Sequence, residues 1–141
     1  MIEAAAGMAA FFFVLNEGGW RWGESLAASD PLYRQSTTAC LTAIVVMQMV
    51  NVYLCRSDRD SVLSRGWLDN RLIVTGLAVE LGLILLIDYT GVGNAIFGAA
   101  PIAASAWLIM IPFALTMLGL EESRKAFVRR LTRESPGTAA A

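Results

Sequence analysis

The chain has 141 residues, 56% of them hydrophobic, and a formal net charge of −1. This length suits a single domain, and the hydrophobic content is high for a soluble one. The sequence contains no histidine, which excludes imidazole catalysis and histidine metal ligands. The two cysteines, Cys40 and Cys55, fall on one predicted helix about 22 Å apart, which excludes a disulfide between them.

Long apolar runs with charges at their edges predict an all-α, polytopic membrane helical bundle. We expect four transmembrane helices, with spans at about 1–15, 38–54, 72–87 and 103–120. The first run lacks the basic n-region of a signal peptide. As a helix it would reach about 22 Å, which is short of the roughly 30 Å hydrocarbon core. We therefore expect it to be a truncated helix whose beginning is missing.

Polar or glycine-rich segments separate these spans. Residues 16–37 form a polar connector in which Trp20, Trp22 and Tyr33 are placed as aromatic anchors at the membrane interface. Residues 90–100 are rich in glycine, which predicts a turn region.

Two prolines, one just before the last span and one inside it, have different expected effects. Pro101 can open the helix, because the first helical position needs no backbone N–H. Pro112 lies inside the helix and should kink it. Residues 121–133 should continue as a charged helix, so that a membrane domain covers 1–134, and 135–141 should be a disordered tail.

The distribution of arginine and lysine predicts the topology. Nine of the eleven lie in residues 55–71 or after residue 120. The positive-inside rule therefore places the 55–71 loop and the C-terminus in the cytoplasm of a multi-pass protein in the cell inner (plasma) membrane. The basic residues of 124–133 are expected to contact anionic lipid of the bilayer.

Glu80 lies at the middle of the third span. A charge there costs about 2.5–3.5 kcal/mol, which the eleven Leu, Ile and Val residues of 72–87 offset by about 3–6 kcal/mol. The helix can insert, but the carboxyl group must face the protein interior or be protonated. We interpret Glu80 as a candidate ion or proton ligand, the alternative being a hydrogen-bonded helix contact.

Gln48 and Asn51 lie three residues apart and share one helix face. Amide oxygens suit cations as neutral ligands, and the same side chains also join membrane helices, so both interpretations remain open. Glu3 is expected to reach the membrane interface, and Asp88, at the outer edge of its span, is expected to be solvated.

The chain has no glycine-rich phosphate loop and no Ser/His/Asp or Cys/His set. We therefore expect no catalytic residues, no enzyme activity of the chain alone, no cofactor bound to it and no nucleic-acid partner.

A family resemblance joins several of these features. The run VVMQMVNVYLCRSDRDSV, the run LDNRLIVTGLAVELGLILLIDYTGVGNAIFG, Trp107 and EESRKAFVRR together resemble the C-terminal membrane region of P-type cation-transporting ATPases. The similarity is to bacterial relatives of the calcium and sodium/potassium pumps, and it extends over about residues 1–133.

The resemblance implies that the four spans are the seventh to tenth helices of a ten-helix pump. It implies that Gln48, Asn51 and Glu80 are cation-binding candidates. Because Gln48 and Asn51 are neutral amides and Glu80 has no second acid beside it, the resemblance leaves the transported cation unresolved among Ca, Na, K, Mg and H. It also implies that Mg-ATP is used by domains missing from this chain, since the Asp-Lys-Thr-Gly motif is absent. The implied partners are the remaining pump helices or another membrane subunit.

Two other functions are open on the sequence. One is an autonomous four-span, proton-coupled antiporter of the small multidrug type, which the span number and a membrane glutamate favour. The other is a small regulatory membrane protein that binds a larger transporter.

Overall fold

The computed structural model describes residues 1–55 and 70–133, and the predicted tail and most of the predicted 55–71 loop lie outside them. Within the described part every regular element is helical, which confirms the predicted all-α class. The helices are α1 (Ile2–Glu17), α2 (Pro31–Leu54), α3 (Arg71–Tyr89), α4 (Gly91–Phe97), α5 (Ala104–Leu108) and α6 (Met110–Arg133).

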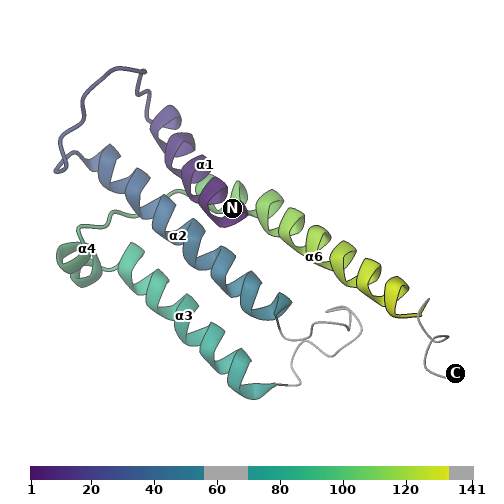
Figure 1. The fold of residues 1–141 in the computed structure, drawn as a ribbon. Helices are drawn as coiled ribbons and strands as arrows, with labels where there is room; N and C mark the ends of the chain where they lie inside the picture. The colour runs from purple at the N-terminus through teal and green to yellow at the C-terminus, as the bar shows by residue number, and fades with distance from the viewer. Residues whose placement is uncertain (56–69, 134–141) are drawn as a thin grey trace, which may run out of the picture.

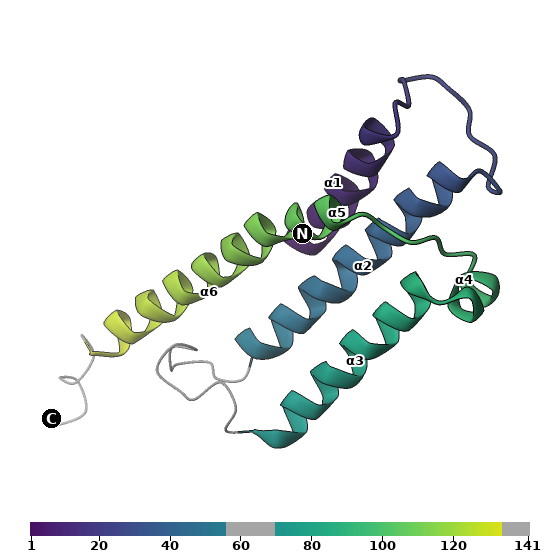
Figure 2. The same ribbon diagram turned by 180° about the vertical axis from the view of Figure 1, so that it is seen from behind.

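Helix α2 is the centre of the arrangement. It lies between α1 and α3, and α1 packs along it more extensively than any other described helix does (Figure 1). Helices α5 and α6 start beside α1, and α6 then runs on to the C-terminal end of the molecule (Figure 2). Every other long helix in the described part therefore meets α2.

Within the described residues, three helical stretches are long and apolar enough to cross a membrane: Pro31–Leu54, Arg71–Tyr89 and Ala104–Arg129. They contain the second and third predicted spans and all but the first residue of the fourth. Helix α1 has 16 residues and reaches only about 24 Å, in line with the expectation that the first segment is too short to span.

The α1–α2 contact consists largely of small side chains. A β-carbon added at Gly7 would lie 3.2 Å from both Cys40 Sγ and Ile44 Cγ1, so the two backbones approach closely. Small residues at such positions are typical of helix pairs in membranes, where packing rather than hydrophobicity drives association. The buried core formed with the start of the last span comprises Ala6, Ala10, Val14, Ala39, Ala43, Met47, Ile102, Ala106 and Met110.

Helix α2 begins at Pro31, well before the predicted span. Asp30 is its N-cap, and its Oδ1 accepts a hydrogen bond of 2.8 Å from the backbone N–H of Leu32. An aspartate cap followed by proline at the first helical position is a strong helix start. Because residues 31–37 are polar, hydropathy did not reveal that the helix starts at Pro31.

The predicted turn region contains the short helix α4. Thr90 caps it by accepting a hydrogen bond of 3.0 Å from the N–H of Gly93, and Gly98 ends it with a left-handed φ of 65°. Gly93 packs on the end of α3 so tightly that an added β-carbon would lie 2.5 Å from the carbonyl oxygen of Leu86. Helix α4 thereby closes over the last turn of α3.

The expectation that Pro101 opens the last helix is wrong, because the helix begins at Ala104. The segment before it is held by α2 instead. Gln35 Nε2 donates to the carbonyl of Pro101 at 3.1 Å, and the N–H of Ala100 donates to Thr38 Oγ1 at 3.0 Å. The helix is interrupted at Ile109, between α5 and α6, which is where Pro112 removes a backbone hydrogen bond.

Lys125 connects the end of α6 to the end of α2. Its ammonium group is fully buried and donates a hydrogen bond of 2.7 Å to the carbonyl of Leu54. A cation is favourable there because the last carbonyls of a helix carry partial negative charge. The expected lipid contact is therefore wrong for this residue, which instead holds two helix ends together.

The substitution Gly93→Ala should destabilise the protein by about 1–3 kcal/mol, because the new methyl group would overlap the backbone of α3. Gly82→Ala is the matched control, since apart from its chain neighbours and the nearby backbone of α3 itself no atom lies within 4 Å of its added β-carbon. That change should be neutral or stabilise α3 by up to about 1 kcal/mol. Thermal unfolding in detergent micelles measures the change in stability of both variants. Equal changes would contradict the close packing of α4 on α3.

Candidate cation-binding site

Gln48 lies on the side of α2 that faces α1. Its Nε2 donates a hydrogen bond of 3.2 Å to Glu3 Oε2, which joins the two helices near the start of α1. The sequence predicted a membrane-interface position for Glu3 and did not predict this hydrogen bond to Gln48. The structure therefore pairs a carboxylate with an amide, two groups whose oxygens suit a hard cation.

Asn51 lies one turn further along α2 and is partly buried. Its Oδ1 accepts a long hydrogen bond of 3.5 Å from Cys55 Sγ in its own helix. This hydrogen bond engages the Asn51 amide oxygen with a neighbouring residue of the same chain segment. It does not connect Asn51 to Gln48 or Glu3.

Glu80 lies in the middle of α3 and is partly buried. Within residues 1–55 and 70–133 it has no hydrogen-bond or ion-pair partner. The described residues also contain no group of three or more Cys, Asp or Glu side chains that could hold a metal ion together. Of the candidates, the structure thus joins Gln48 to Glu3 and leaves Asn51 and Glu80 apart, so their ligand roles remain predictions.

The most enclosed carboxylate of the membrane helices is Asp88, which was expected to be solvated. It is fully buried, and its Oδ2 accepts a hydrogen bond of 2.8 Å from Thr42 Oγ1 on α2. Its Oδ1 has no hydrogen-bond partner among the described residues. The sequence placed Asp88 at the correct end of α3 but gave no sign that its side chain is buried against Thr42 of α2.

Beside Asp88, a short series of hydrogen bonds connects α3 to the last span. Tyr89 donates from its hydroxyl group to the carbonyl of Ile102 at 3.0 Å, and it accepts from Trp107 Nε1 at 2.9 Å. With its amide nitrogen facing them, Asn94 donates to the carbonyls of Ile87 and Asp88 at 2.8 and 3.1 Å. The polar groups around the end of α3 are therefore largely paired, which makes Asp88 Oδ1 the exception.

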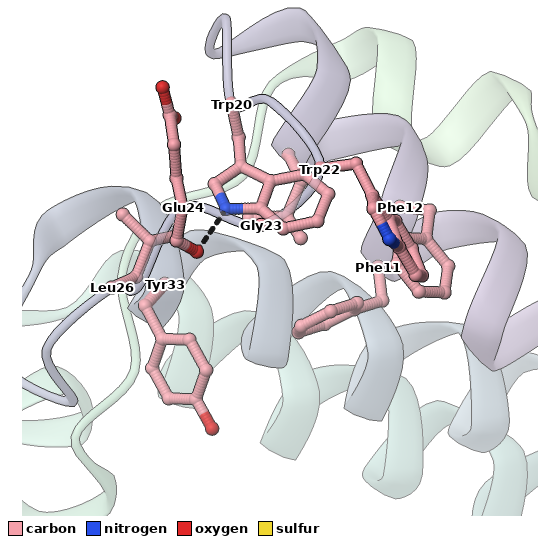
Figure 3. A pocket seen from close by; sticks show the side chains of 9 residues that line it. Phe11, Phe12, Trp20, Trp22, Gly23, Glu24, Leu26 and Tyr33 are labelled. Atoms are coloured by element: carbon pink, nitrogen blue, oxygen red, sulfur yellow. Dashed lines mark hydrogen bonds between the residues drawn. The ribbon is translucent and has the colours of Figure 1, made fainter.

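An aromatic pocket of about 450 Å³ lies where α1 meets the 18–30 connector (Figure 3). Trp20 Nε1 donates to the carbonyl of Glu24 at 2.9 Å, and the Trp20 and Trp22 rings pack edge to face with centroids 5.8 Å apart. Trp22 is 86% exposed, which is consistent with the interfacial role predicted for it. The remaining residues lining the pocket are Phe11, Phe12, Leu15, Gly23, Leu26 and Tyr33.

Comparison with known proteins gives one family and several relatives. Residues 1–127 match the family model described as the C-terminus of cation transporting ATPases. The sodium/potassium-transporting ATPase subunit alpha of Tetronarce californica is 24% identical over 154 residues, and subunit alpha-2 of Gallus gallus is 28% identical over 155. Each alignment covers 92% of this chain and 15% of the relative.

The helical fold and its apolar spans define a membrane protein domain of the α-helical bundle class. Because the family model covers most of the chain, the chain belongs to the family of cation transporting ATPase C-terminal domains. The predicted resemblance to the C-terminal membrane region of P-type cation-transporting ATPases is thereby confirmed.

The contact between Thr42 and Asp88 yields a prediction about stability. Thr42→Val keeps the side-chain shape but removes the donor to a buried carboxyl group, which should cost about 1–3 kcal/mol. Thr37→Val is the matched control, since Thr37 Oγ1 donates only within its own helix, to the carbonyls of Tyr33 and Arg34. Thermal unfolding in detergent compares the two, and similar losses would show that the contact between helices adds little.

Proposed function

We propose that this chain is the membrane-embedded C-terminal support of a P-type cation pump and contributes part of its cation-coordinating surface. The family membership supports the first part, and the pairing of Glu3 with Gln48 supports the second. In this proposal α2 is the scaffold that positions the ligands, and Gln48, Asn51 and Glu80 supply oxygen atoms to the transported cation.

The Glu3–Gln48 contact is the observation on which the coordination role depends. A bound cation would replace the donated hydrogen bond, so that a carboxylate oxygen and the Gln48 amide oxygen could both face it. Asn51, one turn away, would complete this side of the site. Further ligands would come from the remaining pump helices, since no larger ligand group exists within the described residues.

The exposed apolar face of α3 suits such helices or lipid as its partners. Leu83 is 56% exposed, Val79 is 56% exposed and Leu86 is 49% exposed, although all three lie in an apolar span. In the proposed pump the 55–71 loop and the C-terminus face the cytoplasm of the inner membrane, and phosphoryl transfer from Mg-ATP belongs to domains outside this chain.

A phosphorylation assay on the natural protein tests the pump assignment. An antibody against the exposed 18–30 connector should capture, from native membranes incubated with radiolabelled ATP, an acid-stable phosphoprotein that hydroxylamine cleaves. Such chemistry identifies an aspartyl phosphate. Capture of an unphosphorylated protein would contradict the pump assignment, and it would favour an independent antiporter or a regulatory protein.

Variants at the native locus test the coordination role in the same assay. Gln48→Ala and Asn51→Ala should each raise the cation concentration needed for half-maximal phosphorylation by roughly tenfold, equivalent to about 1.4 kcal/mol. Val52→Ala, an exposed change on the same helix, is the control and should have no effect. Normal cation dependence in all three variants would contradict coordination by α2 while leaving the pump assignment intact.

A further inference from the structure

Asp88 is a buried acid that has no charge partner among the described residues. Its side chain is fully buried where α3 ends, and only one of its two carboxyl oxygens accepts a hydrogen bond, from Thr42. The other oxygen, Oδ1, has no donor among the described residues. Neither the family comparison nor the candidate set of Gln48, Asn51 and Glu80 assigns a role to this group.

The elements packed around Asp88 bring no positive charge to it. Helix α4 and the 98–103 segment contain no charged residue, and neither does α5. On α2 the nearest charged residue is Arg34, which is exposed and lies two turns, or about 12 Å, before Thr42. On α3 the nearest is Glu80, two turns away and itself acidic.

An ionised carboxylate in this place would be a buried charge with a single neutral hydrogen bond. Such an arrangement is strongly unfavourable, because burial removes the hydration that water provides and nothing here replaces it. A carboxylic acid removes the charge and keeps the hydrogen bond from Thr42. We propose that Asp88 is a proton-binding site, and that the bound proton holds α3 against α2.

The proton, rather than a metal ion, fits the geometry. A sodium or calcium ion needs several oxygen ligands around it. The neighbouring oxygens are already engaged, since Thr42 Oγ1 points its proton at Asp88 Oδ2 and Asn94 occupies the carbonyls of Ile87 and Asp88. One unpaired oxygen is sufficient for a proton and insufficient for a metal ion.

This site is placed to control the position of α3. The Thr42–Asp88 bond is the side-chain hydrogen bond that joins α2 to α3 within the described residues, and much of the remaining surface of α3 is exposed. Because the docked state binds the proton and the undocked state can release it to water, docking is stable at low pH and weakens as the pH rises. The proposal is independent of the pump assignment, since it depends only on the α2–α3 contact.

Infrared spectroscopy of the full chain in lipid nanodiscs tests the proton directly. At neutral pH the spectrum should contain a carboxylic acid C=O band that moves when the protein is made with ¹³C-labelled aspartate. This labelling assigns the band to aspartate in the unmodified protein, so that the test does not depend on a variant that folds. Asp88→Asn should abolish the band, and Glu80→Gln, the matched control on α3, should leave it.

Two results would overturn the proposal. The first is the absence of an aspartic acid band at neutral pH. The second is loss of that band when sodium or potassium replaces a bulky organic cation at constant pH, which would identify a metal-ion site instead.

Amide hydrogen exchange at the end of α3 tests the link to docking. In the wild type the opening constant, corrected for the intrinsic exchange rate, should rise up to tenfold per pH unit from the pH at which undocked Asp88 ionises, and should level off once docked Asp88 ionises as well. Asp88→Asn keeps a neutral acceptor for Thr42 and should make the opening independent of pH. A pH dependence that persists in Asp88→Asn and disappears in Glu80→Gln would contradict the role of Asp88.

Discussion

The close contact between α1 and α2 is the interaction on which the remaining structure depends. In a bilayer, lipid tails are as apolar as leucine side chains, so helices associate through close packing and hydrogen bonds. The glycine and alanine residues of this interface meet that condition, with Gly7 nearly in contact with Cys40 and Ile44. The contact leaves Gln48 opposite Glu3, so the packing of small residues positions a polar pair that joins the two helices.

Helix α2 also satisfies polar groups on its other sides. Its Thr42 side chain bonds to Asp88 on α3, and Gln35 and Thr38 hold the irregular segment before the last helix. Irregular backbone at the edge of a membrane needs such partners, because lipid offers none. The side chains of one helix thereby fix the positions of α1, α3 and the last span, which suits a supporting role.

Hydropathy and the position of Pro112 predicted most of the fold. The long apolar runs located the membrane helices, and Pro112 located the interruption at Ile109 because a proline removes a specific backbone hydrogen bond. The early start of α2 was also readable, from Asp30 followed by Pro31, but the polar residues after it outweighed that signal.

The site could be predicted only in part. Gln48 was recognised as an unusual polar residue in an apolar run, whereas its pairing with Glu3 depends on how two helices align. The burial of Asp88 could not be predicted for a related reason. Hydropathy gives the depth of a residue along a span and says nothing about which neighbour covers it. The last turn of α3, which carries Asp88, packs against Thr42 of α2 and against α4, whose tight return needs Gly93 and has no periodic signature.

Disulfide cross-linking in native membranes tests the α1–α2 arrangement most directly. In a Cys55→Ser background, Gly7→Cys should form a disulfide with Cys40 under mild oxidation, since the β-carbon at position 7 lies 3.2 Å from Cys40 Sγ. After tryptic cleavage in the 18–30 connector, the two fragments should stay joined until a reductant is added. Separate fragments for Gly7→Cys, or equal cross-linking for Ala5→Cys on the exposed face of α1, would contradict the arrangement.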